Sequence, residues 1–201
     1  MSTVTQANQE HHEEHHFDGS KNVFGFWLYI MSDCVLFATL FAVYAVFHRH
    51  TFGGPGAQEI FSLPYVFVET MILLISSFTF GLATLARNSS NINHVIKFLW
   101  LTAFLGLCFI GMEVHEFYEL IQEGHTWSSS AFLSSFFVLV GTHGLHVTMG
   151  IIWIIGMTFQ LKKNGMTPMA KTKLTYLGLF WHFLDIVWIF VFSIVYLLGA
   201  I

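Results

Sequence analysis

The sequence predicts an all-α integral membrane protein, built as a bundle of five transmembrane helices. Of its 201 residues, 55% are hydrophobic and only 10% are charged, whereas soluble globular domains carry about 25% charged residues. Five apolar segments are each long enough to cross about 30 Å of hydrocarbon at about 1.5 Å per residue. Eight Lys and Arg residues and a net charge of −4 leave no basic patch for nucleic acid.

The five predicted spans cover about 23–47, 64–86, 95–121, 132–161 and 174–199. Pro64 suits the first turn of the second span, because the backbone N–H that proline lacks would have no acceptor within the helix at that position. Turn-forming residues separate the spans at 53–56, 88–91, 128–130, 164–165 and 167–168. None of these connections is long enough for a soluble domain, so we expect one membrane domain over 23–201.

Residues 1–22 precede the first span and contain HHEEHH at 11–16. Four His beside Glu could hold a divalent ion weakly, but nothing in the sequence fixes their geometry. We therefore expect a disordered cytoplasmic tail and assign it no function. Cys34 and Cys108 lie within apolar runs, far from a CxxC spacing, so we expect two free thiols.

The positions of Lys and Arg predict the orientation of the chain. With five spans, one side of the membrane receives seven of them: Lys21, Arg87, Lys97, Lys162, Lys163, Lys171 and Lys173. The opposite side receives Arg49 alone. Because cytoplasmic loops carry the excess of positive residues, we expect the N-terminus in the cytoplasm and the C-terminus in the periplasm.

Ionisable residues occur in every predicted span. They are Asp33, Glu69, Glu113, His115, Glu116, Glu119, His143, His146, His182 and Asp185. An aspartate at the centre of a spanning helix costs about 2.5–3.5 kcal/mol on insertion scales, so such residues are expected to face the bundle interior. Three-residue spacings place Glu113 with Glu116, His143 with His146, and His182 with Asp185 on shared helix faces. Gly141 and Gly144 beside the histidines would let another backbone approach closely.

Three interpretations of these residues follow from spacing alone. The first is a cofactor site, either a bis-His haem or a di-metal centre; bundle di-iron sites, however, pair Glu with His three residues later on one helix, and neither helix shows that motif. The second is a proton or ion path. The third is a set of inter-helix hydrogen bonds that fix the bundle, which we favour because such bonds are common in membrane bundles, at about 0.6 kcal/mol each.

Long motifs give the chain a resemblance to a known family. GTHGLHV at 141–147 and WHFLDIVW at 181–188 resemble subunit III of the haem–copper respiratory oxidases. FGFWLYIMSDCVLF at 24–37 and GMEVHEF at 111–117 are similar to the cytochrome bo-type ubiquinol oxidase branch. The resemblance covers nearly the whole chain after residue 20.

The resemblance implies a non-catalytic subunit of a proton-pumping ubiquinol oxidase in a bacterial inner membrane. Haem, copper and ubiquinol would belong to partner subunits, and this chain would hold none of them. Its main contact would be subunit I, whose assembly and stability it supports, with subunit II and a small subunit IV as further partners. Membrane phospholipid would bind in a cleft. Larger members of the family have two further helices that help to form that cleft.

The resemblance also implies roles for individual residues. Asp33 matches a buried carboxylate that follows Ser and is commonly Glu, and Glu116 matches the acid of the third of the five helices. The expected structural polar network comprises Asp33, Glu69, Glu113, Glu116, His143, His146, His182 and Asp185. No residue is expected to be catalytic, to bind a cofactor or to ligate a metal.

Three alternatives remain open. An aa3-type cytochrome c oxidase subunit III would differ only in local similarity, since nothing in this chain touches the electron donor. A small haem-binding membrane cytochrome would use the histidines within the spans as ligands. A secondary transporter would show internal repeats and helices broken by Gly or Pro at corresponding positions, and the sequence shows neither.

Overall fold

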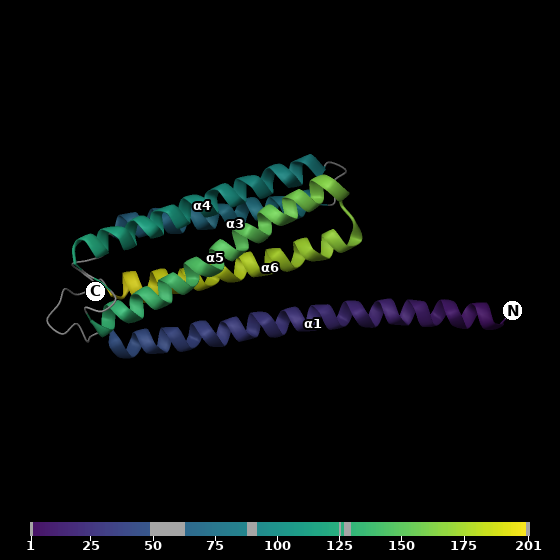
Figure 1. Ribbon diagram of the computed structural model, residues 1–201, viewed down its shortest axis with the longest axis horizontal. Helices are drawn as coiled ribbons and strands as arrows, with labels where there is room; N and C mark the ends of the chain where they lie inside the picture. Colours follow the sequence, from purple (N-terminus) through teal and green to yellow (C-terminus); the bar gives the residue numbers. More distant parts are fainter. Residues whose placement is uncertain (1, 49–62, 88–91, 125, 127–129, 200–201) are drawn as a thin grey trace. The chain divides into compact units, whose positions relative to one another are not determined.

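The computed structural model describes residues 2–48, 63–87, 92–124, 126 and 130–199, with side chains from residue 23 onward. Its elements are α1 (Ser2–Phe47), α3 (Leu63–Ala86), α4 (Ile92–Gln122), α5 (Ala131–Asn164) and α6 (Pro168–Val191), and α6 continues into a π-helix, η1 (Phe192–Leu197) (Figure 1). Five helical segments of this described part are long and apolar enough to cross a membrane. The prediction of an all-helical fold with five helices able to span a membrane is confirmed for the described residues.

The bounds of the helices lie within about three residues of the predicted spans except at the start of the fifth. The span within α1 is Val23–Phe47, as predicted, whereas the last span begins at Pro168 rather than at 174. The hydroxyl of Thr167 caps the first turn by accepting a 3.2 Å hydrogen bond from the amide of Ala170. Pro168 then occupies the first helical position, where its fixed φ favours the helix. The Thr-Pro pair therefore opens α6 instead of lying in the connection before it.

Some predictions fall outside the described residues. These are the turns at 53–56 and 88–91, most of the 128–130 turn, and the position of Arg49. The side chains of residues 1–22 are also outside the described part, so the disordered His-rich tail stays a prediction.

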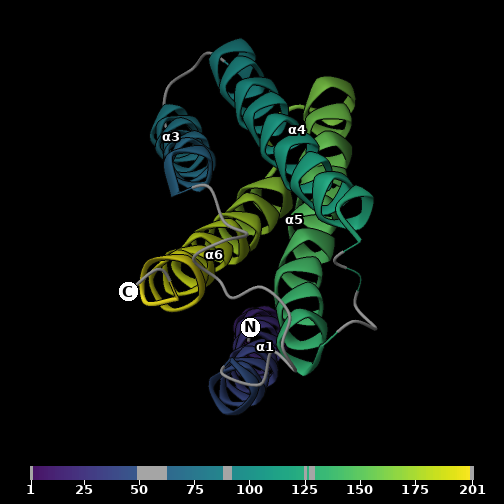
Figure 2. The same cartoon turned by 90° about the vertical axis from the view of Figure 1, so that its left-hand side faces the viewer.

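The chain divides into two units, Met1–Ala38 and Thr39–Ile201. In the second unit, α3 and α5 each pack against both α4 and α6, so that the four helices form a closed ring (Figure 2). The last turns of α1 belong to this unit, and the hydroxyl of Tyr44 donates a 3.4 Å hydrogen bond to the carbonyl of Val195 in η1.

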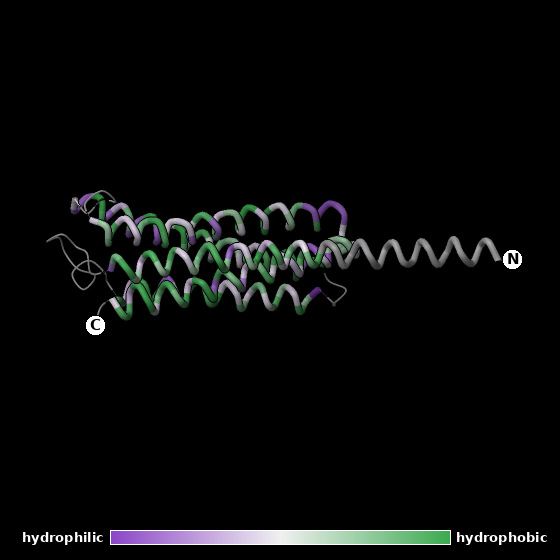
Figure 3. Tube along the Cα trace, turned by 90° about the horizontal axis from the view of Figure 1, so that it is seen from below, coloured by the Kyte–Doolittle hydropathy of each residue, from purple (hydrophilic) through white to green (hydrophobic). Residues whose placement is uncertain are grey.

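The helices carry apolar residues along most of their length and hydrophilic residues near their ends (Figure 3). Large apolar side chains such as Phe78 and Leu145 are exposed on the outside of the bundle, whereas Ser76, Thr102 and His143 are buried inside it. In lipid no hydrophobic force drives the helices together, so they associate through close packing and hydrogen bonds. The buried polar residues are therefore expected to determine which helices of this bundle pack against each other.

Candidate functional site

Two buried tryptophans fasten α6 to α3. The indole N–H of Trp181 donates a 3.2 Å hydrogen bond to the Ser76 hydroxyl, and that of Trp188 donates a 3.1 Å bond to the Thr70 hydroxyl. The two tryptophans are two helical turns apart on α6 and therefore share a face. A buried indole N–H needs a partner, and both partners come from α3.

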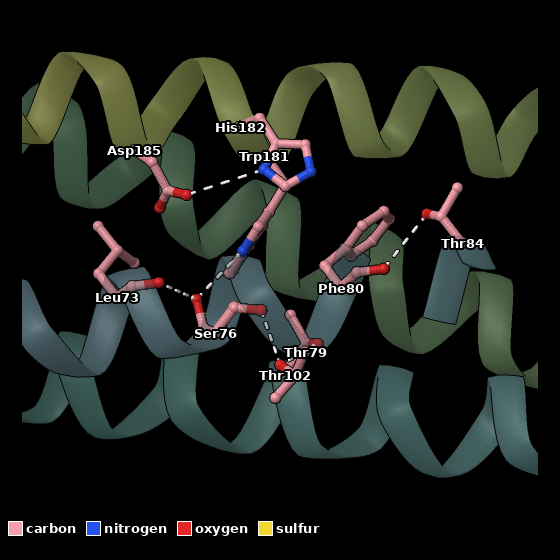
Figure 4. Close-up of polar contacts among 9 residues, drawn as sticks. All are labelled: Leu73, Ser76, Thr79, Phe80, Thr84, Thr102, Trp181, His182 and Asp185. Atoms are coloured by element: carbon pink, nitrogen blue, oxygen red, sulfur yellow. Dashed lines mark hydrogen bonds and ion pairs between the residues drawn. The ribbon is translucent and has the colours of Figure 1, made fainter. Parts of the chain in front are cut away.

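The contact of Trp181 with Ser76 is part of a set of polar contacts that involves three helices (Figure 4). Ser76 donates to the carbonyl of Leu73 at 2.6 Å while it accepts from Trp181. One turn further on, the hydroxyl of Thr79 lies 2.8 Å from that of Thr102 in α4. Each of these threonines also lies within hydrogen-bond distance of a carbonyl in its own helix. The chain of hydroxyls thus connects α6, α3 and α4 without any charged group.

Small residues make room for Trp181. Its ring approaches Gly150 of α5 and Gly106 of α4 so closely that a Cβ built at either glycine would lie about 3 Å from ring carbons, at 2.9 Å and 3.0 Å. The indole is therefore held between two helices while its N–H is bound to a third. Gly150 shares its face with the two histidines of α5, as the spacing predicted.

Three carboxyl groups meet near the other tryptophan. Glu69 of α3 and Glu113 and Glu116 of α4 are all buried, and Glu69 is 0% exposed. Glu69 interacts electrostatically with both of the others, and Glu113 interacts with Glu116. The phenol of Tyr196 in η1 donates a 3.0 Å hydrogen bond to Oε2 of Glu116. The three glutamates Glu69, Glu113 and Glu116 are named here the carboxyl cluster. They come from two of the four helices of the ring, α3 and α4.

The carboxyl group of Glu113 lies against the backbone of α5 at Gly144. A Cβ built at Gly144 would lie 2.7 Å from Oε2 of Glu113. We expected Gly141 and Gly144 to let a neighbouring backbone approach, but the groups that approach them are side chains. A Cβ built at Gly141 would lie 3.8 Å from a ring carbon of Phe117. The physical reason is that the space left by the absent Cβ of a glycine can be filled by a side chain from the next helix as well as by a closely crossing backbone.

The two histidines of α5 have different surroundings. His143 is fully buried; its ring lies tilted against that of Trp188, with the ring centroids 5.0 Å apart, and meets Phe109 edge-on at 5.9 Å. His146 is partly exposed, and its Nδ1 lies 2.7 Å from the carbonyl of Thr142 in its own helix. Their rings therefore do not share one environment, although they share a helix face.

His182 and Asp185 form a loose pair on α6. Nδ1 of His182 lies 4.0 Å from Oδ2 of Asp185, the side chain of His182 is 49% exposed, and Asp185 is buried (Figure 4). The His182 ring also meets Phe80 of α3 edge-on at 6.0 Å. Within the described part of the chain, Oδ1 of Asp185 is buried without a hydrogen-bond partner.

Asp33 belongs to the first unit, where it is buried and accepts a hydrogen bond from Tyr29 one turn earlier. The structure thus brings three of the eight predicted residues together in the carboxyl cluster and pairs two more on α6. Their shared role as a structural network stays a prediction.

Among the described residues, no group of three or more His, Cys, Asp or Glu side chains has the arrangement of a metal site. Cys34 and Cys108 are both free thiols. The described residues thus give no support to a di-metal centre built from the carboxylates of α4 and the histidines of α5.

Several residues of this polar interior are not singled out by any pattern in the sequence. Thr70, Ser76, Thr79 and Thr102 are ordinary hydroxyl residues whose importance depends on which helix lies opposite. Tyr196 reaches Glu116 from a π-helix, and such irregular turns often occur at functional sites. The only signal in the sequence was the seven-residue interval between Trp181 and Trp188, which places both on one face.

The family model for cytochrome c oxidase subunit III matches residues 3–200. The chain belongs to that family. It is 55% identical over 190 residues to the cytochrome bo(3) ubiquinol oxidase subunit 3 of Pseudomonas aeruginosa, a match that covers 94% of this chain and 91% of the relative. The protein of the same title from Buchnera aphidicola subsp. Acyrthosiphon pisum is 44% identical over 200 residues, covering 100% of this chain and 97% of the relative.

A subunit III relative with a different title is also similar. The cytochrome c oxidase subunit 3 of Bacillus sp. strain PS3 is 41% identical over 184 residues, covering 92% of this chain and 89% of the relative. Membership of the subunit III family is consistent with the character of the site, because its buried hydroxyl and indole groups connect neighbouring helices. The chain is a multi-pass membrane subunit of a respiratory oxidase.

Proposed function

We propose that this chain is the non-catalytic subunit III of a proton-pumping, cytochrome bo-type ubiquinol oxidase in a bacterial inner membrane. The observation that carries the proposal is the 55% identity to the Pseudomonas aeruginosa subunit over 94% of this chain. The oxidase would oxidise ubiquinol and reduce oxygen to water on haem and copper held by partner subunits. This chain would support the assembly and stability of subunit I, with subunit II and a small subunit IV in the same complex.

The structure supports a scaffold role through the nature of its buried contacts. The tryptophan and threonine bonds join α3, α4 and α6 to one another, and His182 exposes about half of its side chain in the middle of a span. An exposed ionisable group at that depth is costly in lipid. Coverage by a neighbouring oxidase subunit would remove that cost, and bound phospholipid would cover the apolar remainder of the surface.

The N-terminus would be cytoplasmic and the C-terminus periplasmic. The support for this orientation is the distribution of Lys and Arg, with seven on one side and one on the other.

A second candidate is subunit III of a cytochrome c oxidase, which is favoured by the 41% identity to the Bacillus sp. protein. The two candidates differ in the electron donor of the complex. We would purify the intact complex through a tag on this chain and supply ubiquinol or reduced cytochrome c as the donor. Oxygen uptake with ubiquinol alone is expected; uptake driven by cytochrome c alone would replace the proposal with the second candidate.

The scaffold role is tested with a complex assembled without this chain. The initial rate of quinol oxidation per haem should equal that of the complete complex, whereas the activity should decay faster during turnover. An initial rate that is lost entirely would place this chain in the reaction itself.

A further inference from the structure

The carboxyl cluster has no positive partner in the described part of the chain. Its members, Glu69, Glu113 and Glu116, make no salt bridge there. Glu69 lies near the start of α3 and Arg87 follows its end. Lys97 lies near the start of α4, whereas Glu113 and Glu116 lie near its end. The other lysines whose side chains are described lie at the end of α5 or in the first turns of α6. Several ionised carboxylates in a low-dielectric interior repel one another and lose their hydration. The cluster therefore needs a bound positive species to neutralise it.

A second, independent observation comes from the facing helix. Both carboxyl oxygens of Glu69 are buried and have no hydrogen-bond partner among the described residues, and Oε2 of Glu113 is in the same condition. Buried polar atoms of this kind are rare, and each calls for a bound ligand or a functional reason. The described side chains do not have the arrangement of a metal site, which leaves the proton as the species that fits.

The cluster is connected to one end of the bundle by a row of carboxyl groups on α4. Glu113, Glu116 and Glu119 follow one another at three-residue intervals, so each is a neighbour of the next on the surface of the helix. Glu113 and Glu116 are buried, whereas Glu119 is 65% exposed three residues before α4 ends at Gln122. Glu116 interacts electrostatically with Glu119 as well as with Glu113. The row thus leads from an exposed acid to the buried cluster.

We propose that Glu119, Glu116, Glu113 and Glu69 form a proton-exchange path that ends in a proton-binding site buried within this chain. A proton enters at Glu119, passes to Glu116, and is held by Glu113 and Glu69. Because Glu69 and Oε2 of Glu113 have no hydrogen-bond partner among the described residues, each transfer runs through a bridging water. The O–H bond of the donor carboxyl group breaks as the water gains that proton, and the water gives up another proton to form an O–H bond at the acceptor oxygen, so no redox partner is required. This site goes beyond the proposed scaffold role and does not depend on which electron donor the oxidase uses.

Other titratable groups face the path from each neighbouring element. Tyr65 of α3 interacts with Glu69, Glu116 and Glu119, and Tyr196 of η1 donates to Glu116. His115 lies 3.8 Å from Glu119 on the exposed side. On α5, His143 immediately precedes Gly144, against which the Glu113 carboxyl group packs. None of these groups carries a fixed positive charge, so they do not remove the need for a proton.

The experiment is infrared spectroscopy of the intact complex while the buffer is exchanged from H₂O to D₂O. A protonated carboxyl group has a C=O band that is distinct from the carboxylate band and shifts when its proton is replaced by deuterium. We expect such a band in the wild type and its loss in Glu69→Gln, which keeps the shape and removes the exchangeable acid. Glu69→Asp should retain a shifted band if the Gln variant fails to assemble.

The path itself is tested at its entrance. Glu119→Gln should slow deuterium exchange at the Glu69 band by about tenfold or more, as expected for a raised transfer barrier, while the amount of subunit per haem stays constant. Glu123→Gln is the matched control, because Glu123 is exposed one turn further along and lies outside the path. Exchange that is unchanged in Glu119→Gln would overturn the path. A wild-type spectrum without a protonated carboxyl band sensitive to Glu69 would overturn the binding site.

Discussion

The indole N–H of Trp188 donates a 3.1 Å hydrogen bond to the hydroxyl of Thr70, which in turn donates to the carbonyl of Val66 at 2.9 Å. The bond therefore joins α6 to α3 and leaves neither group unpaired. It lies beside His143 of α5, whose ring packs against that of Trp188 in a tilted arrangement. The side chains of Trp188, Thr70 and His143 thus connect three helices of the ring.

Thr70→Val should destabilise the bundle because it keeps the shape of Thr and leaves the buried Trp188 N–H unpaired. The expected loss is about 1–3 kcal/mol in the free energy of unfolding. In a Trp188→Phe background the same change should cost almost nothing, since the donor is already absent. The measurement is a double-mutant cycle on unfolding in mixed micelles. Thr158→Val is the control, because Thr158 is buried and donates to the carbonyl of its own helix at Ile154. Equal costs in both backgrounds would contradict the pairing.

Gly150→Ala should destabilise α5 packing although alanine is the better helix former. A Cβ at Gly150 would lie 2.9 Å from the Trp181 ring, which its hydrogen bond to Ser76 and its contact with Gly106 hold in place. Overpacking of this kind costs about 1–3 kcal/mol. Gly156→Ala in the same helix meets nothing within 4 Å and should be neutral or stabilising. The comparison is the unfolding midpoint of the two variants, and equal midpoints would show that the Trp181 ring moves freely.

The sequence predicted the five spans well because a run of about 20 apolar residues has few alternatives to a transmembrane helix. It misplaced the start of α6 because Thr167 and Pro168 are turn formers and helix openers alike, and only the capping bond decides between them.

The partners inside the bundle could not be predicted in the same way. A three-residue spacing shows that Glu113 and Glu116 share a face, but it does not show that Glu69 of α3 faces them. That choice depends on the rotation and the depth of each helix. The contact between Tyr196 and Glu116 depends further on the π-helix, which shifts the register of the last turn.

The chain expressed without its partners should be colourless. Of the four histidines within the spans (His115, His143, His146 and His182), only His143 is fully buried, and its ring is already in contact with the rings of Trp188 and Phe109. The measurement is the visible spectrum of the purified chain after haem is supplied during expression. A stoichiometric Soret band that disappears in His143→Leu would favour the membrane-cytochrome alternative over the proposed scaffold subunit.

The topology is expected to be N-in and C-out, because seven of the eight Lys and Arg residues fall on one side of five spans. A reporter that is active only in the periplasm should function when it is fused after Ile201. The same reporter fused after Lys163, between α5 and α6, should be silent. The opposite pattern would show that the positive residues do not set the orientation of this chain.

His182→Leu and Asp185→Leu should both damage assembly more than chemistry, and the histidine variant should be the more severe. Removing His182 leaves the buried Asp185 without the nitrogen that lies 4.0 Å from it, whereas removing Asp185 leaves a His182 that is half exposed and free to turn toward a neighbour. A buried polar group left unpaired costs about 1–3 kcal/mol, and more when it is charged. The double Leu variant should recover part of the loss, because it leaves neither partner behind.

The amount of this subunit retained per haem after purification measures the assembly of these variants, and the initial rate of quinol oxidation measures the chemistry. Leucine favours insertion into lipid, so the last span should still form, and the expected variant is an inserted subunit that dissociates from the oxidase or lets it inactivate during turnover. Ile186→Leu, at an exposed apolar position of the same helix, should behave as the wild type. If His182→Leu stays fully bound while the initial rate per haem falls by about a hundredfold, a loss of about 2.7 kcal/mol in transition-state stabilisation, then the pair acts in the reaction and the structural interpretation is wrong.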